Sequence, residues 1–214
     1  MKKILYLLFV LCFFGLESNA QIESLAGPRI GVVYITASPG SMWLNGDIDL
    51  DEIGDLPPNY DEIVKGAFTT LYGWQWESRF AEGGDVTGIV EWVALAGGME
   101  RGKFLPSVSS LVGARTNSGF EFAAGPNLSL SGVGMVFGLG YNFKSGNLNM
   151  PVNIAFLPGR KSSSTVETYI EPDQGPDGLW GTSDDINGGP GPSYDVDYNT
   201  GSRISITVGF NMNR

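Results

Sequence analysis

The chain closes with GSRISITVGFNMNR (residues 201–214), and this stretch decides the fold. Apolar residues stand at every second position from Ile204 to Met212, with small or polar residues between them. A period of two places alternate side chains on opposite faces of a β-strand. The pattern therefore predicts a terminal strand with one apolar face and one polar face. What the apolar face contacts has to be worked out from the rest of the chain.

Seven earlier stretches alternate in the same way. They cover residues 29–37, 67–81, 86–98, 105–117, 119–130, 132–144 and 148–156. The tight connections AEGGD (81–85), TNSG (116–119) and KSGN (144–147) alternate with connections that are mostly longer. Short turns at one end and longer loops at the other are typical of an up-and-down meander. We therefore predict an all-β fold, an eight-stranded antiparallel up-and-down transmembrane β-barrel.

The composition of the two faces indicates which one points outward. Large aromatic residues gather near the strand ends on the apolar face, as in the aromatic girdles of membrane barrels. The opposite face is rich in Gly, Ser, Thr and Asn, which suit a narrow lumen filled by side chains. We expect the apolar face to meet outer-membrane lipid. The alternative is a soluble periplasmic lipocalin-like barrel with the apolar face inside, binding an apolar ligand.

Charged residues share the polar face by parity. They are Glu77, Glu91, Glu121, Arg29, Arg79, Arg115 and Arg203. Lone buried carboxylates would cost several kcal/mol each, so we expect a mixed-charge network that fills the lumen. A role of the glutamates in acid–base catalysis is the weaker interpretation. The chain has no His to activate a serine, and we expect no enzymatic activity.

The first twenty residues have the layout of a secretory signal peptide. Two lysines precede an apolar run from Ile4 to Leu16, and a short polar stretch ends at Ala20. We predict cleavage near Ala20, which leaves residues 21–214 as the barrel. A membrane anchor and lipidation at Cys12 are weaker alternatives, because the run is short and Leu11 precedes the cysteine.

Acidic residues concentrate in two predicted loops on the long-loop side, at about 38–65 and 158–200. The net charge is −10; residues 38–65 hold seven acidic residues and residues 161–200 hold eight. A negative surface repels nucleic acid, so we expect no nucleic-acid partner. The loops instead offer a surface for a ligand or protein partner, although simple solvation also explains their charge.

The second loop contains EPDQGPDGLWGTSDDINGG (171–189), which partly matches a calcium-binding loop. Clustered carboxylates in a Gly-rich segment suit Ca²⁺, which takes six to eight oxygen ligands. The candidate ligands are Asp173, Asp177, Asp184 and Asp185. The match fails at Gly175, and Asp184 replaces the usual bidentate Glu. A turn-rich loop without metal is the alternative.

With these features, the chain resembles the small eight-stranded outer-membrane β-barrel proteins of Gram-negative bacteria. It is also similar to an uncharacterised group of such barrels with YGWQWE, GPNLS, PVNIAF and GSRISITVGFN segments. The resemblance implies outer-membrane localisation but no particular activity. Barrels of this class usually end in an aromatic residue, whereas Phe210 here is followed by four more residues. We expect a non-enzymatic barrel with a structural or surface-interaction role; a narrow porin-like solute conduit is the alternative.

Overall fold

The computed structural model describes residues 24–49, 64–176, 178, 180–181, 183 and 186–213. The predicted signal peptide (1–20) lies outside these residues, and so does much of the first acidic loop. Among the described residues, no helix is long and apolar enough to cross a membrane.

Antiparallel strands dominate the described residues. They are β1 (Ser24–Ile35), β2 (Ala67–Gly83), β3 (Val86–Gly97), β4 (Leu105–Thr116), β5 (Phe120–Ser129), β6 (Gly132–Ser145), β7 (Leu148–Leu157), β8 (Lys161–Ile170), β9 (Gly189–Asn199), β10 (Arg203–Gly209) and β11 (Asn211–Asn213). Two short helices accompany them, α2 (Pro39–Asn45) and the 3₁₀ helix η2 (Met99–Arg101).

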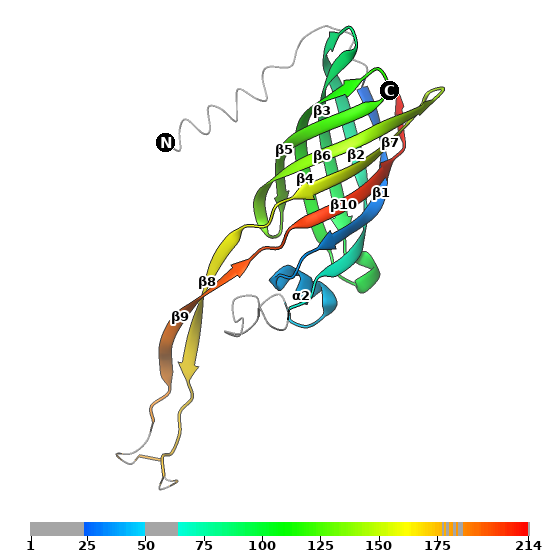
Figure 1. Cartoon of the computed structure of the whole chain (residues 1–214). Helices are drawn as coiled ribbons and strands as arrows, with labels where there is room; N and C mark the ends of the chain where they lie inside the picture. The colour runs from blue at the N-terminus through cyan, green and yellow to red at the C-terminus, as the bar shows by residue number, and fades with distance from the viewer. Residues whose placement is uncertain are drawn as a thin grey trace.

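Strands β1 to β7 form a meander in which each strand pairs with the next. Strand β10 closes the sheet, because it pairs with β7 on one side and with β1 on the other. Strand β11 continues it with the same two partners. The predicted eight-stranded antiparallel barrel is therefore confirmed, with β10 and β11 together as its eighth strand (Figure 1).

The terminal strand is not continuous, although its alternation is unbroken. It is interrupted at Phe210, whose backbone N–H donates to the carbonyl of Pro28 at 3.0 Å. The backbones are close here: a Cβ added to Gly27 would collide with the carbonyl of Phe210. Only glycine permits such an approach.

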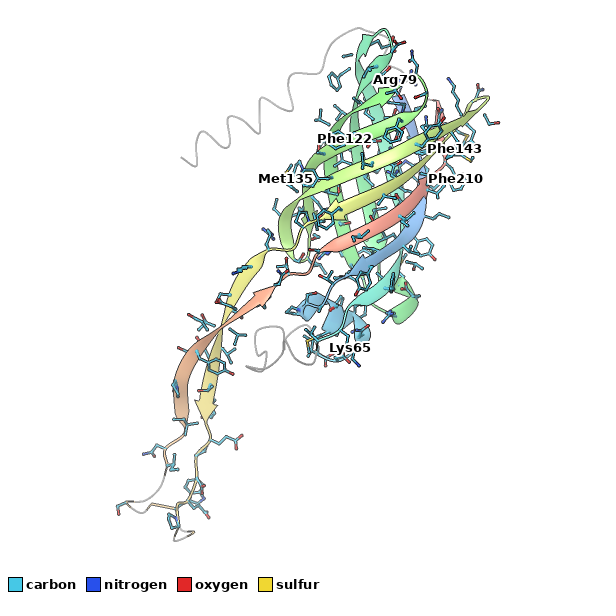
Figure 2. The ribbon with its side chains drawn as sticks, in the orientation of Figure 1. Lys65, Arg79, Phe122, Met135, Phe143 and Phe210 are labelled. Carbon is cyan, nitrogen blue, oxygen red and sulfur yellow. The ribbon has the colours of Figure 1, made fainter. Side chains whose placement is uncertain are left out.

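The two faces lie as expected from their composition. Every strand of the barrel carries large apolar side chains on its outer surface, with exposed fractions from 38% for Trp74 to 62% for Phe68. Phe122, Met135 and Phe143 belong to this outer surface, which Figure 2 shows covered with side chains. Five of the seven charged residues of the opposite face are buried inside, and Arg79 and Arg203 are half-buried. This is the opposite of the orientation that the lipocalin-like alternative requires.

The two ends of the barrel differ, as Figure 1 shows. Short turns join β2 to β3, β4 to β5 and β6 to β7 at one end, where the C-terminus also lies. At the other end are α2, η2 and a hairpin of β8 and β9 that projects well beyond the barrel. The hairpin lies within the predicted loop 158–200, for which two paired strands were not predicted.

The helix α2 joins the hairpin to the barrel. Met42 packs with Val166 of β8 and Val196 of β9 in a small buried cluster. On its other side, Leu44 is buried with Val33 and Leu71 at the end of the lumen. The single α-helix of the described residues therefore packs against both barrel and hairpin.

Candidate functional site: the barrel lumen

The lumen contains a layer of buried charge near the short-turn end. We define the charged layer as Arg29, Gln75, Glu77, Glu91, Arg115 and Glu121. Arg115 is its centre: Nη1 and Nη2 donate to the two carboxylate oxygens of Glu77 at 2.5 and 2.6 Å. The Nε of Arg115 also donates to Glu121. Bidentate pairing of this kind is the strongest geometry for an Arg–carboxylate contact.

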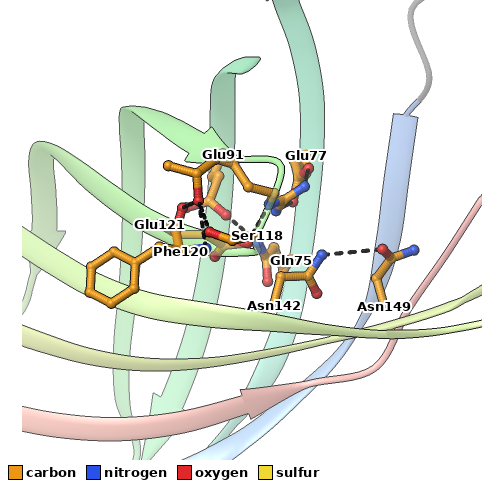
Figure 3. Close-up of polar contacts among 10 residues, drawn as sticks. Gln75, Glu77, Glu91, Ser118, Phe120, Glu121, Asn142 and Asn149 are labelled. Atoms are coloured by element: carbon orange, nitrogen blue, oxygen red, sulfur yellow. Dashed lines mark hydrogen bonds and ion pairs between the residues drawn. The ribbon is translucent and has the colours of Figure 1, made fainter. Parts of the chain in front are cut away.

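The strand register brings these groups together from distant parts of the chain. Glu77 of β2 lies opposite Glu91 of β3, and Arg115 of β4 lies opposite Glu121 of β5. Two carboxylates side by side would repel each other, so each needs its own donor. Glu91 accepts from Gln75 Nε2 at 2.5 Å, and Glu77 accepts from Arg115. Figure 3 shows Gln75, Glu77, Glu91 and Glu121 converging inside the barrel.

Arg29 of β1 is the second cation of the charged layer and is only 3% exposed. The charges that act on it most strongly are those of Glu91, Glu121 and Glu77. When the Asn153 amide is turned so that its oxygen faces Arg29, it accepts from Nη2 at 2.8 Å. The Nε of Arg29 and the Oε2 of Glu121 are buried without a hydrogen-bond partner. The Oε1 of Gln75 is buried without a partner as well, so the layer keeps one free donor and two free acceptors.

Towards the long-loop end an apolar cluster fills part of the lumen. We define the apolar layer as Val93, Leu111, Ala123 and Val136, with Leu95, Ala155 and Leu157 packed against it. It borders a cavity of about 130 Å³ that Arg29, Glu91 and Glu121 also line. The lining is mostly apolar above a floor of buried charge, and polar side chains such as Ser109, Asn127 and Thr207 also contribute to it.

Helix α2 is held at the long-loop end by its caps and by two basic residues. Ser38 and Ser41 form a reciprocal capping box, and Gly46 ends the helix with φ of 84°. Lys103 donates to the carbonyl of Trp43, and its ammonium lies 4.8 Å from the centre of the Trp43 ring. Arg101 donates to Asn45 Oδ1 at 3.0 Å. These contacts fix the helix over the rim of the barrel.

Glu100 in η2 strengthens the same rim. Its carboxylate accepts from Thr69 Oγ1 at 2.5 Å, from Thr70 Oγ1 at 2.6 Å and from the Thr70 N–H at 3.1 Å. Burial alone would raise the pKa of Glu100, but these hydrogen bonds favour its charged form. Together they lower its pKa to about 2.

The remaining predicted luminal arginines lie outside the charged layer. Arg79, near the short-turn end, approaches Glu82 to 4.0 Å. Arg203 lies at the long-loop end, where it donates to the hydroxyls of Ser129 and Ser131 at 3.1 and 2.6 Å. Parity correctly predicts an inward direction for Arg203 but not its depth along the barrel, which depends on register.

The calcium prediction falls mostly outside the described residues. Asp173 is described, and its backbone pairs with Ile186 across the distal part of the hairpin. Asp177, Asp184 and Asp185 are not described. Within the described part of the chain, no group of three or more His, Cys, Asp or Glu is placed to hold a metal ion. Calcium binding therefore stays a prediction.

Two parts of the site were not predicted. Gln75 shows inward parity, but no sequence pattern indicates that it is the donor to Glu91. Helix α2 was placed in a loop, although SPGS (38–41) carries Ser at the cap and Pro at the first helical position, a recognisable start signal.

In comparisons with known proteins, no family model, no curated protein and no solved structure matches this chain. The resemblance to small outer-membrane barrels therefore stays a prediction. What the fold and the lumen define is a class: closed antiparallel barrels with an apolar exterior and a charged interior.

Proposed function

We propose that this protein is a non-enzymatic barrel of a bacterial outer membrane, with a surface-interaction role at its long-loop end. One observation carries the proposal: large apolar side chains are exposed on every barrel strand, around the whole circumference. Soluble monomers rarely expose apolar patches beyond a few hundred Å². A closed barrel satisfies all of its backbone hydrogen bonds internally, which allows it to stand in lipid.

The interior supports a non-conducting, non-catalytic role. Arg115 occupies the lumen together with two glutamates, and Leu44 of α2 is buried at the long-loop end. A solute conduit would need hydrated, unpaired luminal charges. The carboxylates of Glu77 and Glu91 are committed to internal donors and are each 1% exposed, which argues against acid–base chemistry on a substrate.

The surface role rests on the projecting hairpin. Strands β8 and β9 pair only with each other in the described structure, and they carry exposed Tyr169, Ile170 and Tyr194. Their other residues are mostly Ser, Thr, Pro and charged residues, which lipid would not accommodate. The hairpin therefore belongs in water outside the bilayer, where it is available to a partner.

Paired substitutions test the membrane placement. An arginine near the bilayer centre of a barrel costs about 2–4 kcal/mol. Leu139→Arg, on the outer surface of β6, should lower the free energy of unfolding in lipid vesicles by that amount. Ile170→Arg, in the hairpin, should leave it unchanged. Equal effects of the two changes, or a wild-type chain that stays in the aqueous fraction without a heat-dependent gel shift, would refute the proposal.

Cysteine labelling tests the orientation. The only cysteine of the chain is Cys12, in the predicted signal peptide, so single cysteines can be added elsewhere. We expect a membrane-impermeant maleimide to label Ser193→Cys in the hairpin on intact cells. It should label Ser118→Cys, in the β4–β5 turn, only after the outer membrane is opened. The reverse pattern would place the hairpin in the periplasm and contradict the surface role.

A further inference from the structure

We propose that the lumen contains a binding site for one small uncharged molecule with a compact apolar body and a single hydroxyl, of the size of a phenol. The site is the 130 Å³ cavity between the apolar layer and the charged layer. The paired luminal charges account for the filling of the barrel below it, but not for this space.

Size limits the ligand first. An apolar cavity of about 150 Å³ accommodates a benzene molecule, so a cavity of 130 Å³ suits an apolar body of about six heavy atoms. Its walls include Leu71, Val93, Leu111 and Val136, all of them apolar and buried. Such walls favour an aromatic ring or a short alkyl group.

The floor specifies the polar group. Arg29 and Glu121 both line the cavity, and each is 3% exposed. The Nε of Arg29 is a buried donor without an acceptor, and the Oε2 of Glu121 is a buried acceptor without a donor. Buried polar atoms are nearly always hydrogen-bonded. A hydroxyl satisfies both, because it accepts one hydrogen bond and donates another.

The charges around the cavity disfavour anions and cations of the same size. The charged groups that line the cavity are two carboxylates, Glu91 and Glu121, and two guanidinium groups, Arg29 and Arg203, so their charges balance and an anion finds no net positive charge there. A cation would have to leave water for apolar walls and lie beside Arg29. The lining continues to Leu105, Leu130 and Arg203, so entry is from the long-loop end, beside α2.

The test uses the folded full-length barrel in lipid nanodiscs and fluorine NMR of 4-fluorophenol. We expect a bound signal that 4-fluorotoluene, which lacks the hydroxyl, produces about tenfold more weakly. Fluorobenzoate and fluorobenzylammonium should give none. Binding of 4-fluorotoluene as tight as that of 4-fluorophenol, or tighter binding of either ion, would overturn the assignment of Arg29 and Glu121 as partners of the hydroxyl. Absence of any bound signal would mean that the cavity holds water only.

Two matched variants on β6 separate the lumen from the lipid. Val136 is 8% exposed and lines the cavity, so Val136→Phe fills it. Val133 is 56% exposed, so Val133→Phe makes the same change on the outer surface. The bound signal should vanish in the first variant and persist in the second. An equal signal in both would show partition into lipid and refute the site.

A second measurement keeps the proposal testable if Val136→Phe does not fold. Crystals of the unmodified protein grown with 4-bromophenol should show an anomalous bromine peak among Leu71, Val93 and Leu111. The hydroxyl should lie within hydrogen-bond distance of Arg29 Nε. A bromine peak found only on the outer surface would overturn the proposal.

Discussion

The charged layer and the apolar layer of the lumen are built by the same strands from residues only two positions apart. On β3, Glu91 belongs to the charged layer and Val93 to the apolar layer; on β5, Glu121 and Ala123 are divided in the same way. All four side chains point inward, so the period of two cannot explain the difference. What distinguishes them is depth along the barrel, which decides whether a neighbouring strand supplies a donor.

The comparison also shows how a narrow lumen can be filled in two ways. The charged layer is held by directional contacts, because Arg115 makes three hydrogen bonds to two glutamates. The apolar layer relies on packing, which leaves a cavity. Removing one partner from the first leaves a buried charge, whereas trimming the second only enlarges a space. The two layers should therefore respond differently to mutation.

The largest effect is expected in the charged layer. Arg115→Met would leave Glu77 and Glu121 buried without their cation, and breaking a buried ion pair in this way costs about 3–5 kcal/mol. We expect that loss in the free energy of unfolding by urea. Adding Glu77→Gln and Glu121→Gln to the same chain should restore most of it. A loss that persists in the triple variant would mean that Arg115 acts through packing rather than charge.

A smaller effect is expected in the apolar layer. Leu111→Ala should lower the free energy of unfolding by about 2–3 kcal/mol, because it removes buried methyl groups beside an existing cavity. Val112→Ala, at the next position on the outer surface, should cost less, because Val112 is exposed and, under the proposed membrane placement, lipid chains fill the space left behind. Equal losses at the two positions would contradict the inward packing of Leu111.

The smallest effect is expected at the rim beyond the apolar layer, where the carboxylate of Glu100 accepts hydrogen bonds from two threonine hydroxyls. The pKa of Glu100 in the folded protein is about 2, below its ordinary value of 4.5. Its contribution to stability is therefore present above about pH 4.5 and is lost as the pH falls towards 2. The Thr70 amide resonance should titrate with a midpoint near 2 and become flat in Glu100→Gln. A midpoint near 4.5 would mean that the hydrogen bonds to Thr69 and Thr70 are not formed.

Much of the barrel was predictable from local pattern. Alternation identified all eight strands, and the positions of short and long connections gave their order. The faces were also predictable, because exposed Phe122 and buried Glu121 differ by one position in a strand of known parity. The hairpin of β8 and β9 was not predicted, because β8 is rich in Ser and Thr and shows little alternation, although Val166 and Val196 pack on α2.

The candidate site was predictable in kind but not in arrangement. Parity placed Glu77, Glu91, Arg115 and Glu121 on one face, the composition of the two faces turned that face into the lumen, and electrostatics required the charges to pair. Which carboxylate Arg115 contacts depends on the stagger between β2, β4 and β5, which no local pattern encodes. The cavity could not be predicted either, because it is the space that remains when eight strands, each specified by its own local pattern, close into a barrel.

The sequence by itself determined the strands, their two faces and the end of the barrel that carries the long connections, because these follow from side-chain period and turn chemistry. Only the tertiary structure decided the depth of each inward residue, the partners of Arg115 and the free polar atoms of Arg29 and Glu121. The physical reason is that closing a barrel fixes the register between strands far apart in the chain. Register then determines which buried polar groups meet and which are left beside a cavity.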